Sequence, residues 1–273
     1  MSFTHQKKLK QKLKRGFFVF LGIYIMISAS LYFLQEKLLF LPTTLEQDYT
    51  YKFSHDFDEL FLKANDGASI NAIHFKVNDP KGAIFYLHGN AGDLQRWGEI
   101  AEYLVDKNYD VLVMDYRTYG KSQGKLSEVA LYADAQMYYD YLKQHYSEND
   151  ITIYGRSLGS GIATYIGSKN KPRQLVLETP YYSILDVAEY RFSFIPVNRF
   201  LKYKILSHKF LKDVSCNVTM IHGTDDSVVP LTSAKRLFES SDKNKTKLHI
   251  IEGGSHNDLI NFKNYHKLIN KLF

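Results

Sequence analysis

Cysteine is almost absent from this sequence. Cys216 is the only one among 273 residues, so the chain forms no intrachain disulfide and offers no cysteine cluster for zinc. Internal repeats and low-complexity tracts are also missing, which argues against a disordered or collagen-like protein. With 45% hydrophobic and 23% charged residues, the composition is that of one large globular domain with an appendage.

Acidic residues are missing from the first fifteen positions, where six cations gather: Lys7, Lys8, Lys10, Lys12, Lys14 and Arg15. The chain has 35 basic and 29 acidic residues, so without these six the two signs balance at 29 each. The net charge of +6 therefore belongs to a basic N-terminal tail, residues 1–16. The rest of the chain shows no basic face and no nucleic-acid motif, so we expect no nucleic-acid partner.

Charge and proline are both absent from residues 17–34, "FFVFLGIYIMISASLYFL". As a helix this segment is about 27 Å long, close to the hydrocarbon thickness of a bilayer. We predict a single transmembrane helix that works as a signal-anchor. Because cations flanking such a helix stay in the cytoplasm, the domain is expected on the far side, in the bacterial periplasm or an equivalent extracytoplasmic space.

Two other interpretations of this apolar segment remain open, a cleaved signal peptide and a buried core helix. Ser28-Ala29-Ser30 supplies small residues near a plausible cleavage point. The apolar run nevertheless continues past that point into "LYFLQEKLLFLP", which reads as a stem leading into the domain. This continuity favours an uncleaved anchor.

Residues 35–273 alternate short apolar runs with longer helical patterns. Several of the runs, such as "AIFYLHG" (83–89) and "DVLVMDY" (110–116), are apolar almost throughout, as expected of strands buried on both faces. A final helix is expected from about Asn257, with Asp258 as its cap. The alternation of apolar runs and helical patterns stops at residues 181–212, which are rich in Phe and Tyr. We therefore predict a small cap insertion there. The pattern predicts a mostly parallel sheet flanked by helices.

Glycine and polar residues follow four of the expected strands: His88-Gly89-Asn90, Gly155-Arg156-Ser157-Leu158-Gly159, His222-Gly223-Thr224-Asp225-Asp226, and Glu252-Gly253-Gly254-Ser255-His256. In a parallel sheet, ligands bind beyond the carboxyl ends of the strands. We therefore expect these four segments to meet at one site.

Ser157 lies in a Gly-x-Ser-x-Gly turn between a strand and a helix, the pattern of a nucleophile elbow. The turn is so tight that its neighbours must be small, which explains Gly155 and Gly159. It places the Leu158 amide at a helix N-terminus, where a developing oxyanion is stabilised. A second amide is expected from the loop after "AIFYLHG", from Asn90 or else from Ala91.

A serine hydroxyl needs a base, and the base needs an acid that fixes its tautomer. His256 follows the last expected strand, and Asp226 follows the strand before it. The chain order serine, acid, histidine is that of α/β-hydrolases. The neighbouring Asp225 is the alternative acid.

These segments resemble the membrane-anchored serine hydrolases of the abhydrolase-domain group. The resemblance runs from about Gln35 to the end, through "QEKLLFLP", "LHGNAGD", "DYRTYGKSQG", "GRSLGSGIA", "ETPYYSILDVA", "HGTDDSVVP" and "GGSHND". It implies an α/β-hydrolase fold with Ser157 as nucleophile, Asp226 as acid and His256 as base. His88 and Gly89 are expected to support the oxyanion loop.

The expected activity is hydrolysis of a carboxylic ester through an acyl-enzyme, without metal or organic cofactor. The aromatic cap suits an acyl chain or another apolar substrate; the alternative role of its rings is to pack the cap onto the sheet. An acyl-protein thioesterase or a serine peptidase is an alternative on the same triad. A non-catalytic binding protein on a hydrolase fold is a further one.

Overall fold

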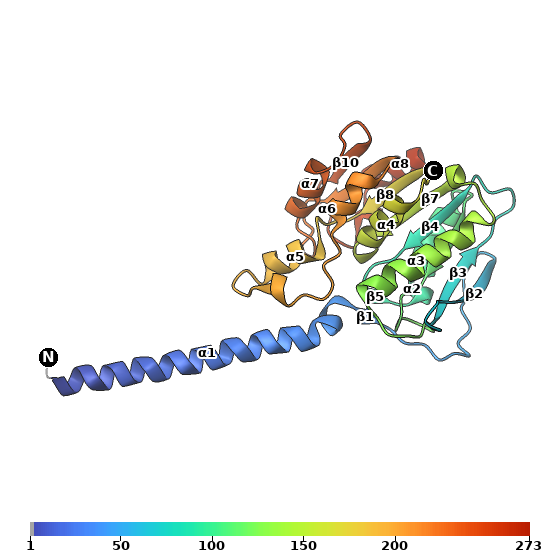
Figure 1. Ribbon diagram of the computed structural model, residues 1–273. Coiled ribbons are helices and arrows are strands. Elements are labelled where there is room, and N and C mark those ends of the chain that lie inside the picture. The colour runs from blue at the N-terminus through green and yellow to red at the C-terminus, as the bar shows by residue number, and fades with distance from the viewer. Residues whose placement is uncertain (1–2) are drawn as a thin grey trace.

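One eight-stranded sheet organises the computed structural model, which describes residues 3–273 (Figure 1). The strands run in the order β10-β9-β8-β7-β4-β6-β3-β2, and all neighbours are parallel except those that pair with β3. Their bounds are β2 (Phe57–Lys63), β3 (Ser69–Phe75), β4 (Ala83–Leu87), β6 (Asp110–Met114), β7 (Ile151–Arg156), β8 (Gln174–Glu178), β9 (Asn217–Gly223) and β10 (Thr246–Ile251). The predicted mostly parallel sheet is thus confirmed.

Helices cover both faces of the sheet. Residues of α3 (Glu128–Lys143), α4 (Leu158–Lys169) and α7 (Leu231–Glu239) share one apolar core with the strands, and residues of α2 (Leu94–Val105) and α8 (Lys263–Leu272) share the other. The central strands β4, β6 and β7 are buried along their whole length, because both of their faces are covered. This arrangement explains why their sequences are apolar runs without alternation.

Between β8 and β9 the chain forms the cap, which consists of short helices. They are α5 (Ile184–Arg191), the 3-10 turn η2 (Val197–Arg199), α6 (Ser207–Phe210) and the 3-10 turn η3 (Leu211–Asp213). The predicted insertion at 181–212 falls on this segment. A further 3-10 turn, η1 (Glu148–Asp150), precedes β7.

The N-terminal helix α1 (Phe3–Leu39) projects away from the sheet, and only its last turns reach the domain (Figure 1). Within Lys10–Leu39, an 18-residue window has a mean hydropathy of 2.2, so the helix is long and apolar enough to cross a membrane. One continuous helix thus contains the predicted anchor, 17–34, and most of the predicted tail, 1–16, whose residues 1 and 2 lie outside the described residues.

After α1 the stem forms a short strand, β1 (Leu41–Pro42), which pairs in parallel with β5 (Ala91–Gly92). β5 belongs to the loop that follows β4. The stem is therefore hydrogen-bonded to a segment for which the sequence predicted an oxyanion-binding role.

The C-terminal region differs from the expectation in one detail. Leu259–Asn261 forms a 3-10 turn, η4, and α8 begins only at Lys263. The Asp258 side chain accepts a hydrogen bond from the Ser255 amide, 2.6 Å away, and caps no helix. The prediction of a helix cap at Asp258 was wrong, because this residue precedes only the 3-10 turn η4 and its carboxylate accepts from the Ser255 amide and not from an amide of the turn.

Candidate active site

Ser157 occupies the turn between β7 and α4 in a strained conformation. Its φ of 51° and ψ of −119° lie outside the regions that a residue with a side chain normally adopts. A Cβ on Gly159 would lie 2.0 Å from the Leu87 carbonyl oxygen, and one on Gly155 would lie 2.5 Å from the Ala163 Cβ. The elbow therefore requires glycine at both positions because strand and helix approach so closely.

Ser157, His256 and Asp226 form one hydrogen-bonded chain. The Ser157 Oγ lies 2.8 Å from the His256 Nε2, and the His256 Nδ1 lies 2.7 Å from the Asp226 Oδ2. All three residues are less than 10% exposed. This network assigns the proton of the neutral imidazole to Nδ1, which leaves Nε2 free to accept the serine proton.

The Asp226 carboxylate is held on both of its oxygens. Its Oδ1 accepts hydrogen bonds from the Val228 and Val229 amides, each 2.8 Å away. Burial by itself would raise the pKa of Asp226. Burial is the largest single effect, but the hydrogen bond and charge of His256, the Val229 amide and the nearby His222 together outweigh it, so the pKa lies below its usual range and the group is ionised at neutral pH.

The two aspartates that the sequence left as alternatives have different surroundings. Asp225 is exposed, and its carboxylate accepts a hydrogen bond from the Thr224 hydroxyl, 2.8 Å away. Asp226 is 7% exposed and contacts the histidine. Geometry thus favours Asp226 as the partner of His256.

Leu158 and Asn90 lie beside Ser157 in one cavity. Leu158 is the first residue of α4, so its amide is at the positive end of the helix dipole. The Asn90 carbonyl accepts hydrogen bonds from the Leu41 amide (2.8 Å) and the Tyr119 hydroxyl (2.7 Å). These bonds fix the loop that carries the second expected oxyanion donor.

His88 is fully buried beside the same loop and is not among the residues that line the cavity at Ser157. Its Nδ1 lies 2.7 Å from the Gly89 carbonyl, which belongs to the peptide that carries the Asn90 amide. The His88 carbonyl accepts from the Tyr116 hydroxyl at 2.7 Å. A Cβ on Gly89 would lie 3.0 Å from Trp97, so this part of the loop has no free space.

The cavity at Ser157 has a volume of about 220 Å³ and a mostly apolar lining. The cap contributes Ile184, Val187, Ala188, Arg191 and Phe192. Two further residues, Leu38 and Leu39, come from the end of α1. None of the described residues that line this cavity is acidic, and Arg191 is the only charged one among them.

Sequence reasoning missed two parts of this site. The first is Glu178, which lies at the end of β8 and is 3% exposed. Its carboxylate lies 3.2 Å from the Arg156 Nε. It also accepts hydrogen bonds from the Tyr154 and Tyr265 hydroxyls. Its backbone carbonyl accepts from the Ser157 amide at 2.9 Å. The other missed part is α1, since an apolar segment predicted to span a membrane gives no sequence signal that its last turn also lines the cavity at Ser157.

The fold and the site define the class. The chain has the α/β-hydrolase fold and is similar to abhydrolase-domain serine hydrolases; it is a hydrolase with esterase-type activity. The profile of the serine aminopeptidase S33 family matches residues 78–212, a range that includes Ser157 and ends before Asp226.

Two relatives in sequence and one in structure illustrate this similarity. Zebrafish (Danio rerio) lysophosphatidylserine lipase ABHD12 is 28% identical over 87% of this chain and 75% of its own length. The uncharacterized protein R595 of Acanthamoeba polyphaga mimivirus is 27% identical over 84% of this chain and 88% of its own. The Pyrococcus furiosus esterase Pf2001 superposes with a TM-score of 0.67 at 20% identity, over 85% of this chain and 96% of that chain. The structural likeness supports the fold.

Proposed function

We propose that the protein is a membrane-anchored hydrolase of carboxylic esters with a fatty acyl group, and that Ser157, His256 and Asp226 are its catalytic triad. One observation carries the proposal: the Ser157 Oγ, the His256 ring and the Asp226 carboxylate are joined at 2.8 and 2.7 Å beside an apolar cavity. The lipase activity named for the zebrafish relative supports the same substrate class.

In the first half of the reaction, the Ser157 Oγ bonds to the ester carbonyl carbon while His256 Nε2 takes the hydroxyl proton. The amides of Leu158 and Asn90 stabilise the negative charge on the carbonyl oxygen. The tetrahedral intermediate then expels the alcohol, which takes its proton from His256. This step leaves the acyl group bonded to Ser157.

In the second half, water takes the place of the alcohol. His256 removes a proton from the water as its oxygen attacks the acyl carbon, and the same amides hold the oxyanion. The bond to Ser157 breaks, and the serine oxygen regains its proton from His256. Asp226 keeps its charge throughout and stabilises the imidazolium that forms in each half.

The pocket favours an ester over a peptide with a free N-terminus. An aminopeptidase must bind the terminal ammonium group of its peptide substrate. An acidic side chain near the nucleophile would pair with this buried charge. No acidic residue is among the described residues of the cavity lining, whereas leucine, isoleucine, valine and phenylalanine side chains dominate it. Apolar lining of this kind binds an acyl chain.

Labelling of the active site tests the proposed nucleophile. We expect a fluorophosphonate probe to label the wild-type protein and to leave Ser157→Ala unlabelled, and p-nitrophenyl esters of increasing chain length to show an optimum above acetate. The readouts are in-gel fluorescence and release of nitrophenolate. Folded wild-type protein that takes no label would contradict the proposal and favour a binding protein.

We further propose that α1 stays in the membrane with its basic end in the cytoplasm. In a Cys216→Ser background, Thr4→Cys should resist a membrane-impermeant maleimide in intact cells, whereas Lys243→Cys, exposed on the domain, should react. Both cysteines should react after lysis. Labelling of Thr4→Cys but not Lys243→Cys in intact cells would reverse the topology.

A further inference from the structure

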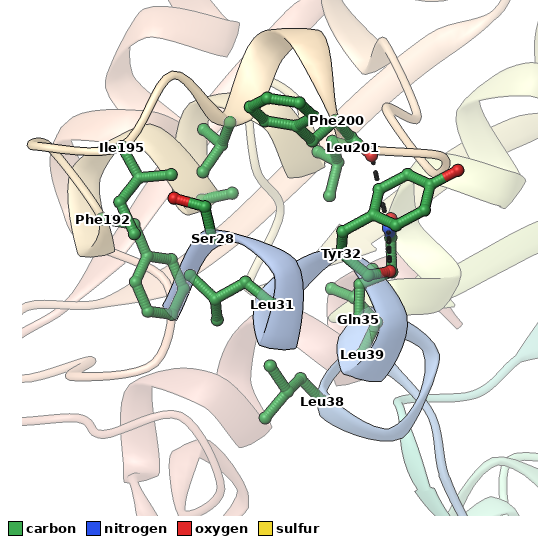
Figure 2. A pocket seen from close by; sticks show the side chains of 12 residues that line it. Ser28, Leu31, Tyr32, Gln35, Leu38, Leu39, Phe192, Ile195, Phe200 and Leu201 are labelled. Carbon is green, nitrogen blue, oxygen red and sulfur yellow. Dashed lines mark hydrogen bonds between the residues drawn. The ribbon is translucent and has the colours of Figure 1, made fainter. Parts of the chain in front are cut away.

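A narrow groove runs between the end of α1 and the cap (Figure 2). Its volume is about 80 Å³, and the α1 side contributes Leu31, Leu38 and Leu39. Phe192, Ile195 and Leu201 face them from the cap. Two elements far apart in sequence thus form one apolar surface.

This groove lies next to the cavity at Ser157 and shares part of its lining. Leu38, Leu39, Ala188 and Phe192 line both the groove and the cavity that holds Ser157. At its other end, Ser28, Tyr32 and Phe200 also line a shallower hollow that includes Tyr24 and Ile25. An apolar path therefore follows α1 from Ser157 into the segment predicted to cross the membrane.

Gln35 fixes the width of this path. Its side chain is 5% exposed, donates to the Tyr32 and Phe200 carbonyls at 2.8 and 3.3 Å, and accepts from the Lys202 amide at 2.7 Å. Because a buried amide with these partners is costly to displace, helix and cap are held together. A groove of about 80 Å³ held in this way has room for only a part of one acyl chain, and none for a second chain beside it.

The groove lies at the depth of the membrane if α1 spans it. Ser28, Leu31 and Tyr32 belong to the apolar segment 17–34, and a bilayer needs about 20 such residues. The cap residues beside them must then enter the outer leaflet. Tyr190, Phe194 and Phe200 of the cap are 69%, 71% and 42% exposed, as expected of side chains that contact lipid.

We propose that this groove, formed jointly by α1 and the cap, admits the acyl chain of a membrane-resident, single-chain ester lipid directly from the bilayer and guides it to Ser157. The inference rests on the proposed esterase function. In this arrangement the anchor is part of the substrate-binding surface, and the substrate chain stays in apolar surroundings throughout its transfer.

A pair of leucines one helical turn apart provides a matched test. Leu31 lines the groove, whereas Leu34 is 46% exposed and lines none of the cavities described above. Full-length protein in phosphatidylcholine vesicles is assayed with p-nitrophenyl palmitate in the bilayer and p-nitrophenyl acetate in water. These two esters share a leaving group and differ only in the chain.

We expect Leu31→Trp to lower the ratio of palmitate to acetate hydrolysis at least tenfold, and Leu34→Trp to change it less than twofold. An unchanged ratio in Leu31→Trp, or an equal fall in both variants, overturns the proposed route while acetate hydrolysis still supports the esterase. Wild-type protein that hydrolyses neither ester overturns the proposed function, and the route with it.

Photocrosslinking gives a second test that does not depend on the folding of Leu31→Trp. Ser157→Ala in the same vesicles is irradiated with a palmitoyl ester that carries a diazirine at the chain end, and crosslinked peptides are identified by mass spectrometry. We expect crosslinks to residues 24–39 and 188–201. Crosslinks confined to other parts of the domain overturn the route.

Discussion

Asp226→Asn is expected to lower kcat/KM for p-nitrophenyl butyrate by about 10⁴, because the amide would select the wrong tautomer of His256. The Val228 and Val229 amides donate to the Asp226 Oδ1, so an asparagine would place its carbonyl oxygen there. Its NH₂ group would then face the His256 Nδ1, 2.7 Å away in the native protein. A donor at this position favours the imidazole protonated on Nε2, which cannot accept the serine proton.

Asp225→Asn is the matched control, since the two aspartates are adjacent and the chemical change is identical. Asp225 is exposed and contacts Thr224, so we expect its variant to keep activity within about threefold. Steady-state kinetics of both variants, with circular dichroism to verify folding, shows which of the two aspartates is the catalytic acid. The opposite pattern, a large loss in Asp225→Asn alone, would assign the acid to the other residue.

Local sequence patterns were sufficient to predict the elbow and the four strand ends that meet beside it. A nucleophile elbow has a short signature because its steric demands fall on two neighbouring glycines, and the buried strands are recognisable as apolar runs. The resemblance indicated Asp226 as the acid, but spacing alone left the adjacent Asp225 as an alternative. Only the orientation of the turn, which buries one and exposes the other, separates them.

The parts of the site that depend on contacts between distant segments could not be predicted from the sequence. Glu178 reads as the last residue of an ordinary strand, and its contacts with Arg156, Tyr154 and Tyr265 depend on how β8 lies beside β7 and under α8. The pairing of β1 with β5 is likewise invisible in two residues of sequence. Parts of the site that arise from tertiary packing of α1 and the stem therefore had no local signal.

The stem connects the anchor with the proposed oxyanion loop. The Leu41 amide donates to the Asn90 carbonyl at 2.8 Å, and the Thr43 amide donates to the Gly92 carbonyl at 2.9 Å. Leu38 and Leu39, a few residues earlier, line the pocket of Ser157. The segment that follows the proposed membrane anchor thus also shapes the place where the substrate carbonyl would bind.

Gly159→Ala is expected to destabilise the protein by at least about 3 kcal/mol, because the elbow has no room for a methyl group. The added Cβ would lie 2.0 Å from the Leu87 carbonyl oxygen and 2.6 Å from that of His88, and both are backbone atoms at the end of the central strand β4. Relief requires α4 to move away from the sheet, which also moves Ser157 away from His256. We therefore expect activity to fall together with stability.

Gly167→Ala, in the same helix, separates this steric effect from the general effect of alanine. Its Cβ would lie 3.4 Å from a Leu175 methyl group, an ordinary contact, and alanine in a helix is favoured by up to about 1 kcal/mol over glycine. Urea unfolding in detergent, followed by the fluorescence of Trp97, measures both variants, since this is the only tryptophan and it is buried beside the elbow. A Gly159→Ala variant as stable as Gly167→Ala would show that strand and helix can separate at the elbow without cost, and the steric account of the strained Ser157 would then have to be abandoned.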